Sequence, residues 1–325
     1  GKIASWWRNV DRQILLEFFF LFLLGLFFSF SSTSSMVGER LNQETYFLFA
    51  KHLIFVLISI FLMCLISIQN RKTIESFLLV VFLVSIFLLT LVPFIGVELN
   101  GSKRWIDFPY LPRFQPIELV KPFFVIVLAK IIVSNNGSKT YFKYLQSLLI
   151  LFFIVFLLVN QPDLGQALLV IFSWTITIFV SGINMIVLSS CVFVSFVVIL
   201  FIIYLFPHKF GYIFARIQTF LNPEKGDNFQ SQKALDAIKQ GGLTGQGMGE
   251  GILKDRVPEA HTDYIIAAIS EEYGVLVILF ILLLFLFIAY KVLNKIFIEE
   301  EEFAKLVLVG LTSLIILQTL IHIGV

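Results

Sequence analysis

The sequence predicts an all-α polytopic membrane protein with about nine transmembrane helices and one long extracytoplasmic loop before the eighth. Three observations support this fold class. Apolar residues make up 58% of the 325 residues, only 14% are charged, and the mean hydropathy is +0.93. Soluble domains usually have about 45–50% apolar and about 25% charged residues. A single soluble domain could not bury this much apolar side chain, so the chain is expected to lie in a bilayer.

Composition also excludes two classes of protein. A formal net charge of +2 provides no basic surface to attract nucleic acid. Cys64 and Cys191 both lie inside apolar runs, which excludes a secreted scaffold held together by disulfides. The sequence has no phosphate-binding P-loop, no zinc pattern and no nucleophile elbow. Its four histidines are dispersed, so no metal site is predicted from spacing.

The nine predicted spans are stretches of about 20 predominantly apolar residues, the length that crosses a bilayer as a helix. The first is too long for the apolar region of a signal peptide and has no small-residue cleavage site after it. We expect residues 1–325 to form a single transmembrane domain. The spans are 14–33, 51–69, 76–98, 118–134, 144–160, 163–182, 184–206, 265–290 and 306–325.

Lysine and arginine predict the orientation, because they accumulate in cytoplasmic loops. The N-terminal flank and the second, fourth and eighth loops are basic, and these segments all lie on one side if the N-terminus is cytoplasmic. The residues concerned are Lys2, Arg8, Arg12, Arg71, Lys72, Lys130, Lys139, Lys143, Lys291, Lys295 and Lys305.

Two segments on the opposite side differ from ordinary connectors. The third loop carries Lys103, Arg104 and Arg113, although short external loops are usually poor in cations. The stretch 207–263 is much longer than a connector needs to be, and loops of this length are usually functional or disordered. Aromatic residues along it argue against a flexible linker, so we expect it to pack against the outer membrane face.

Glu118 and Lys121 are three residues apart and therefore share one face of a helix, where they can pair. One interpretation is a structural ion pair in which the lysine reaches out to the interface. The other uses the nearby Arg104, because an arginine and a lysine beside a cavity suit a pyrophosphate.

Four further carboxylates are of interest. Asp163 precedes the sixth span and is better placed as a helix N-cap than as a catalytic group. Asp263 follows His261 at the mouth of the eighth span, where it is either an N-cap or a general base at the membrane surface. Glu271 and Glu272 lie deeper in the same stretch, so a buried polar network or a partner is expected for them.

These motifs, taken together and in this order, resemble the SEDS family (shape, elongation, division and sporulation), and within it the division-septum branch. The resemblance covers nearly the whole chain. Its pieces are WWRNVDR at 6–12, KRWI at 103–106, QPIELVK at 115–121, QPDLG at 161–165, Arg216 with FLNP at 220–223, GDNFQ at 226–230, AIKQGG at 237–242, GQGMG at 245–249, PEAHTD at 258–263 and EEYG at 271–274.

The resemblance implies a peptidoglycan glycosyltransferase that polymerises lipid II into β-1,4 glycan strands at the outer face of the bacterial cytoplasmic membrane. The implied general base is Asp263, acting in a single inverting displacement. The residues implied to bind substrate are Arg104, Glu118, Lys121, Arg216 and His261. Glu118 would hold Lys121, and a divalent cation (Mg²⁺ or Mn²⁺) could assist the leaving group.

Two departures from the family pattern stand out. The family has about ten membrane helices, so its last helix is expected beyond Val325. Ile117 stands where the family usually has serine, which removes one hydroxyl and is expected to matter little.

The implied partner is a class B penicillin-binding protein, a transpeptidase of the FtsI type, together with other membrane proteins of the division septum. Three alternatives stay open: a lipid II flippase or other transporter, a scaffold that only recruits partners, and the elongation paralogue RodA, which has the same chemistry. Transporters tend to place binding residues near the bilayer midplane, whereas the polar residues here gather at the ends of spans.

Overall fold

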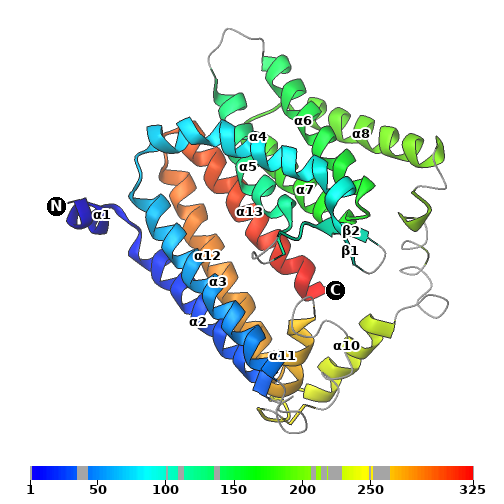
Figure 1. The fold of residues 1–325 in the computed structure, drawn as a ribbon. Coiled ribbons are helices and arrows are strands. Elements are labelled where there is room, and N and C mark those ends of the chain that lie inside the picture. The colour runs from blue at the N-terminus through cyan, green and yellow to red at the C-terminus, as the bar shows by residue number, and fades with distance from the viewer. Residues whose placement is uncertain are drawn as a thin grey trace. The chain divides into compact units, whose positions relative to one another are not determined.

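The computed structural model describes residues 2–34, 43–99, 102–108, 113–134, 140–205, 210–213, 218, 229–248, 250–251 and 264–324. The described chain consists of helices and one small hairpin (Figure 1). In order, the elements are α1 (Lys2–Asn9), α2 (Arg12–Ser34), α3 (Gln43–Ile68), α4 (Arg71–Ile95), β1 (Val97–Leu99), β2 (Ser102–Trp105), α5 (Pro116–Val133), α6 (Thr140–Asn160), α7 (Leu164–Val180), α8 (Met185–Leu205), α10 (Phe229–Gly241), α11 (Ile265–Tyr273), α12 (Val275–Ile298) and α13 (Glu302–Gly324).

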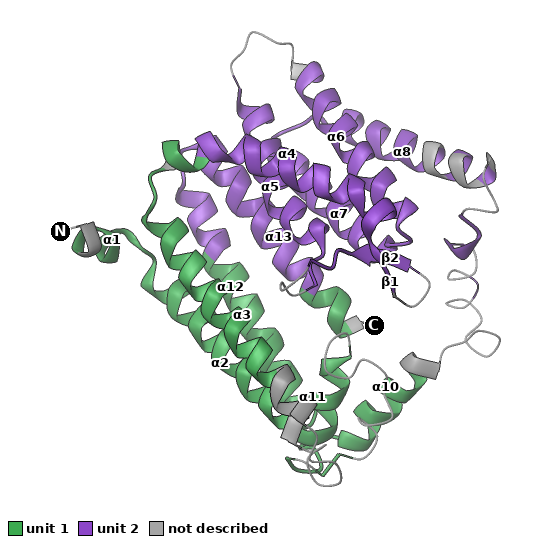
Figure 2. Ribbon diagram, in the orientation of Figure 1, with its two compact units in different colours: residues 1–74, 227–291, 319–325 green, residues 75–226, 292–318 purple. Residues whose placement is uncertain are grey.

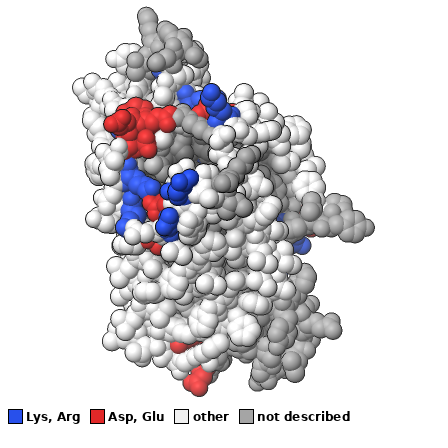
Figure 3. Space-filling model, turned by 90° about the vertical axis from the view of Figure 1, so that its left-hand side faces the viewer, with Lys and Arg blue, Asp and Glu red and all other residues white. Residues whose placement is uncertain are grey.

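Eight of the nine predicted spans coincide with one helix each of the described chain, and the eighth overlaps α11 and most of α12. Six of these helices, α2, α3, α4, α6, α12 and α13, are long and apolar enough to cross a membrane. The apolar helices α7 and α8 have shorter described stretches, and α5 is 18 residues long with three charged side chains. Figure 3 shows one face on which broad areas carry no charged side chain. The chain is therefore a multi-pass membrane protein, as its composition predicts.

The prediction of one continuous eighth span over 265–290 is wrong. The chain breaks at Gly274, so that α11 is a separate short helix and the span α12 begins at Val275 and continues to Ile298. Gly274 has a φ of +81°, and a Cβ there would lie 2.2 Å from the carbonyl oxygen of Leu243. Only glycine meets both conditions, because other residues are strained at positive φ and would collide with that carbonyl.

Contacts group the described residues into two compact units, which Figure 2 colours separately. Unit 1 comprises 1–74, 227–291 and 319–325, and unit 2 comprises 75–226 and 292–318. Neither unit is a continuous stretch of chain. The expectation of a single transmembrane domain is not tested by this grouping and stays a prediction.

Unit 2 is built around α5, half of whose residues are buried. Its apolar side chains pack into one core with α4, α6, α7 and α8. Ile117, which stands where the SEDS family usually has serine, is 1% exposed and belongs to this core. Its side chain therefore makes apolar contacts in place of the serine hydroxyl. Helix α13 also lies close to α5 and α7 at Gly310. A Cβ at this position would lie 2.4 Å from Val125 Cγ1 and 2.9 Å from Thr177 Oγ1.

In unit 1, part of the predicted long loop is folded. Within the stretch 207–263 the structure contains α10, which packs against α11 through Ala234, Ala237 and Ala267. Gly241, the last residue of α10, allows this contact, since a Cβ there would lie 1.9 Å from the carbonyl oxygen of Ser270. The expectation that this stretch is not a flexible linker is confirmed for its described part. Its packing against the membrane face stays a prediction.

Replacing Gly310 with alanine tests the close approach of α13. We expect Gly310→Ala to lower the free energy of unfolding by about 1–3 kcal/mol, because the added methyl group overpacks the contact with Val125 and Thr177. Thermal unfolding of the purified protein in lipid nanodiscs would measure this change.

Gly25→Ala is the matched control within α2, since its Cβ would meet only His52, at 4.0 Å. This variant should be as stable as the wild type or slightly more so, because alanine favours a helix over glycine by about 1 kcal/mol. Equal stability of the two variants would contradict the tight contact at Gly310.

Candidate functional site

Lys121 lies at the centre of a polar cluster in unit 2. The residue is only 3% exposed, and its Nζ is 2.8 Å from Glu118 Oε2, which confirms the predicted ion pair. The same Nζ donates to Gln166 Oε1 at 3.0 Å and to Gln318 Oε1 at 3.1 Å. An ammonium group has three N–H donors, so these three side chains satisfy it completely.

The local sequence explains why Glu118 and Lys121 face this cluster. Pro116 occupies the first turn of α5, where its missing N–H costs nothing and its fixed φ suits a helix. Glu118 follows in the same turn, where a negative charge is favoured by the helix dipole. Its side chain remains 45% exposed, whereas Lys121 is buried. The carboxylate is thus the accessible member of the pair.

Gln318 is a member of the cluster that the sequence analysis missed. Helix α13 supplies it from far along the chain, and the contact at Gly310 sets how closely that helix approaches α5. Ser313 Oγ and Ser173 Oγ lie 3.0 Å apart and join α13 to α7 as well. The available signal was an amide in a predominantly apolar helix, since a polar side chain at membrane depth needs a partner.

Arg104 binds the backbone of the turn between α6 and α7. Its Nε donates to the carbonyl oxygen of Gln161 at 3.3 Å, and its Nη2 donates to the carbonyl oxygen of Pro162. The hairpin of β1 and β2 positions Arg104 for this contact, with Glu98 opposite Lys103 in the antiparallel register. Two of the five donors of the guanidinium are therefore used in holding the turn.

Asp163 is the N-cap of α7, as expected. Its Oδ1 accepts from the backbone N–H of Gln166 at 3.4 Å, and its Oδ2 accepts from Gln115 Nε2 at 3.1 Å. Gln166 then reaches back to α5, where its Nε2 donates to Glu118 Oε1 at 3.1 Å. The cap and the ion pair are consequently parts of one hydrogen-bonded network that joins the starts of α5 and α7.

Glu271 and Glu272 lie in unit 1 and are 0% and 3% exposed, respectively. Glu272 Oε2 accepts a hydrogen bond from Ser31 Oγ at 2.5 Å, and Ser31 in turn accepts from Tyr273 Oη at 2.7 Å. The expected buried polar network is therefore confirmed for Glu272. The backbone of α11 also binds the glycine-rich segment, since Gln246 N donates to the carbonyl oxygen of Glu271 at 2.9 Å.

The structure thus brings Arg104, Glu118 and Lys121 into unit 2 around the starts of α5 and α7. Asp263, His261 and Arg216 lie outside the described residues. The N-cap of α11 (Ile265–Tyr273) is Tyr264, so the interpretation of Asp263 as the N-cap is wrong. The role of Asp263 as a general base stays a prediction.

Known proteins resemble the chain along nearly its whole length. A probable peptidoglycan glycosyltransferase FtsW of Caulobacter vibrioides is 30% identical over 324 residues, covering 99% of this chain and 82% of the relative. A protein of the same name from Haemophilus influenzae is 29% identical over 321 residues, covering 97% of this chain and 80% of the relative.

Solved structures share the fold. A chain from the structure described as "Structural coordination of polymerization and crosslinking by a peptidoglycan synthase complex" aligns with a TM-score of 0.76 at 21% identity, over 97% of this chain and 87% of that one. The rod shape determining protein RodA of Thermus thermophilus aligns with a TM-score of 0.66 at 22% identity, over 98% of this chain and 85% of that one.

The family model FtsW/RodA/SpoVE, described as cell cycle protein, matches residues 12–325. That range contains the Lys121 cluster, the buried glutamates of α11 and every motif that carried the SEDS resemblance except the N-terminal one, of which only Arg12 is included. The chain therefore belongs to the FtsW/RodA/SpoVE family of cell cycle proteins.

Proposed function

We propose that this chain is a peptidoglycan glycosyltransferase that polymerises lipid II into β-1,4 glycan strands at the outer face of the cytoplasmic membrane. The observation that carries this proposal is the similarity, at about 30% identity over 99% of the chain, to a relative named for that activity. The apolar helices of the described chain, together with the polar cluster at the start of α5, are compatible with a lipid-linked substrate.

In the proposed reaction, Asp263 accepts the proton of the acceptor's 4-hydroxyl as that oxygen attacks the anomeric carbon of the donor. The bond between this carbon and the lipid pyrophosphate breaks, and its electron pair leaves with the phosphate oxygen. An α-linked donor becomes a β-1,4 product, which is a single inversion. One base suffices, in contrast to the two carboxyl groups that most glycosidases use.

The departing pyrophosphate needs positive charge nearby, because fixed cations act most strongly where charge develops. Arg104, Lys121 and Arg216 are the proposed sources, with His261 as a further contact. Lys121 has three oxygen partners, so a phosphate oxygen could bind it directly only by replacing one of them. The amide oxygens of Gln166 and Gln318 are neutral and are therefore the partners that an anion would replace most easily.

A divalent cation that assists the leaving group stays a prediction. Among the residues that the structure describes, no three histidine, cysteine, aspartate or glutamate side chains gather in a way that could hold a metal ion. The described residues therefore identify no ligands for it.

The position of the charged cluster favours this function over transport. Glu118 and Lys121 lie in the first two turns of α5, and Asp163 caps the start of α7. Transporters usually bind their substrates near the bilayer midplane, on broken helices. The elongation branch would use the same chemistry, and the relatives named FtsW support the division branch.

The proposed partner is a class B penicillin-binding protein transpeptidase, together with other membrane proteins of the divisome. The similar chain from a complex described as coordinating polymerization and crosslinking supports such a partnership. We further propose that the protein acts at the division septum and that its N-terminus is cytoplasmic, as its basic loops indicate.

The substitution Asp263→Asn tests the proposed base. The complete protein would be purified with its transpeptidase partner and supplied with labelled lipid II, and glycan polymer would be measured on a gel. We expect polymer to disappear, because an amide cannot accept the proton.

The control is Asp236→Asn, which changes an exposed carboxylate on α10 in the same long stretch and should leave polymerisation unchanged. Polymer formation by Asp263→Asn would exclude Asp263 as the base. If the wild type formed no polymer either, with its partner and with Mg²⁺ or Mn²⁺ supplied, the transport interpretation would be favoured.

A double-mutant cycle on the ion pair tests the cluster in unit 2. Lys121→Met should lower the free energy of unfolding by about 1–3 kcal/mol, because it leaves the oxygens of Gln166 and Gln318 without their donor. The loss of stability is no larger because the Glu118 carboxylate, which loses its ion-pair partner, is nearly half exposed and can be hydrated. Thermal unfolding of Lys121→Met, Glu118→Gln and the double variant would measure the coupling, and strictly additive effects would contradict a shared network.

Gln318→Leu tests the residue that α13 contributes. Leucine removes one of the three acceptors of the buried ammonium, so we expect a loss of stability of about 1–3 kcal/mol and a lower rate of polymerisation. Gln318→Glu keeps an oxygen at the same position and should retain more activity than leucine does. Equal activity of the two variants would show that the contact with Lys121 has no part in the reaction.

A further inference from the structure

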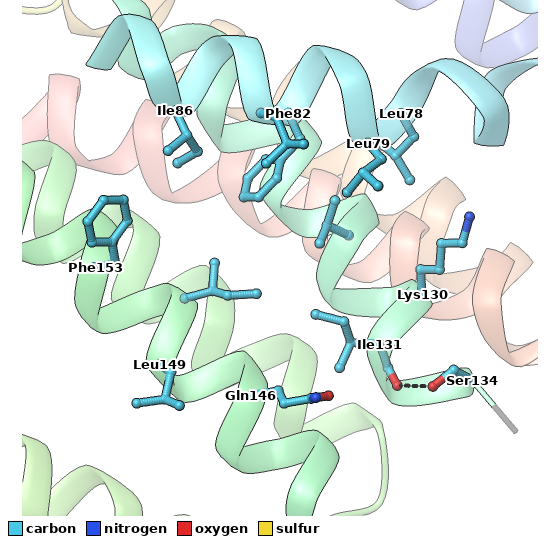
Figure 4. Close-up of a pocket in the computed structure, with 13 residues that line it drawn as sticks. Leu78, Leu79, Phe82, Ile86, Lys130, Ile131, Ser134, Gln146, Leu149 and Phe153 are labelled. Carbon is cyan, nitrogen blue, oxygen red and sulfur yellow. Dashed lines mark hydrogen bonds between the residues drawn. The ribbon is translucent and has the colours of Figure 1, made fainter. Parts of the chain in front are cut away.

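Helices α4, α5 and α6 of unit 2 enclose a groove of 690 Å³ (Figure 4). Its walls are mostly apolar, and Figure 4 shows Ile86 and Phe153 towards one end. The polar lining residues Lys130, Ser134 and Gln146 lie towards the other end, where α5 ends and α6 begins. The volume falls within the range of about 300–1,000 Å³ that is typical of ligand pockets. The groove is therefore amphipathic along its length.

The length of the groove matches one leaflet of a bilayer. Along α4 it extends from Leu78 to Ile86, which is about 12 Å at the rise of an α-helix. The hydrocarbon core of a bilayer is about 30 Å thick, so that one leaflet contributes about half of this. A single acyl chain running from the polar end towards the bilayer centre would fit this length.

The polar end of the groove carries positive charge. The Lys130 side chain is 51% exposed, and its contact with Glu75 Oε2 is long, at 3.9 Å. Lys143 adds a second cation beside the last turn of α5, where its Nζ donates to the carbonyl oxygen of Ile132 at 3.2 Å. The loop at this end is predicted to be cytoplasmic, and the cytoplasmic leaflet is rich in anionic lipids.

We propose that this groove binds one anionic glycerophospholipid, with an acyl chain against the apolar walls and the phosphate beside Lys130. Basic pockets between membrane helices bind anionic head groups in this way. The polyprenyl substrate is a poorer match. Lys121 and Lys130 are nine residues apart, about 13.5 Å along α5, so a diphosphate near Lys121 brings no charge to Lys130.

Lipid retention tests this site. The full chain would be assembled in nanodiscs with equal amounts of phosphatidylglycerol and phosphatidylcholine, released gently, and examined by native mass spectrometry. We expect one phosphatidylglycerol to be retained in preference to phosphatidylcholine. Lys130→Gln should lower its retention about fivefold, the effect of one lysine near an anionic head group. Lys130→Arg should preserve it.

Filling the groove tests the acyl chain. Leu149 of α6 lines the groove, so Leu149→Trp adds a bulky ring there and should abolish lipid retention. The control is Leu145→Trp, because Leu145 is exposed one turn away on the same helix, outside the lining, and its replacement should have no effect. On α4, Leu83→Trp fills the groove in the same way, and Val80→Trp, at an exposed residue outside the lining, is its control. Two independent pairs keep the test valid if one variant does not fold.

Three results would overturn the proposal. Equal retention of the two phospholipids would show that the head group is not recognised. Retention that survives both Leu149→Trp and Leu83→Trp would place the lipid elsewhere. Displacement of phosphatidylglycerol by added undecaprenyl phosphate, one molecule for one, would instead assign the groove to the polyprenyl chain. Because the readout is lipid retention, failure here would leave the proposed polymerase activity untouched.

Discussion

An ammonium group that is removed from water must be surrounded by oxygens, and Lys121 obtains its oxygens from three different helices. Glu118 belongs to the same helix α5, Gln166 comes from the start of α7, and Gln318 comes from α13. A buried lysine without these partners would be strongly destabilising. The arrangement of α5, α7 and α13 is therefore tied to one charge, and the polar cluster is as much a packing element as a candidate site.

Glycines allow the close approaches that this arrangement requires. Gly310 lets α13 lie against α5, and in unit 1 Gly241 and Gly274 let backbone carbonyls come within a distance that no Cβ would permit. In lipid the hydrophobic effect does not favour helix association. Close packing of small residues and interhelical hydrogen bonds must therefore stabilise the contacts between helices. The glycine-rich stretch after α10 is thus part of the packing of α11, which carries the buried Glu271 and Glu272.

Helix α5 carries the charges of both candidate sites, which lie towards its two ends. Near its start, the Lys121 cluster belongs to the proposed chemistry with lipid pyrophosphate. Near its end, Lys130 lies beside an apolar groove that suits a phospholipid of the opposite leaflet. Charged residues at the ends of a membrane helix can reach polar surroundings, whereas the apolar middle of the helix packs in the core of unit 2.

The sequence by itself determined the membrane class, the positions of eight of the nine apolar spans, the pairing of Glu118 with Lys121 and the cap at Asp163. These features depend on composition, helical periodicity or neighbours within a few residues, all of which are visible along the chain. Only the tertiary structure decided that Gln318 completes the environment of Lys121, that Arg104 holds a backbone turn, and that Gly274 divides the eighth span. Each of these depends on atoms far apart in the sequence, because a hydrogen bond or a close contact is set by where whole helices pack, and local patterns do not record that.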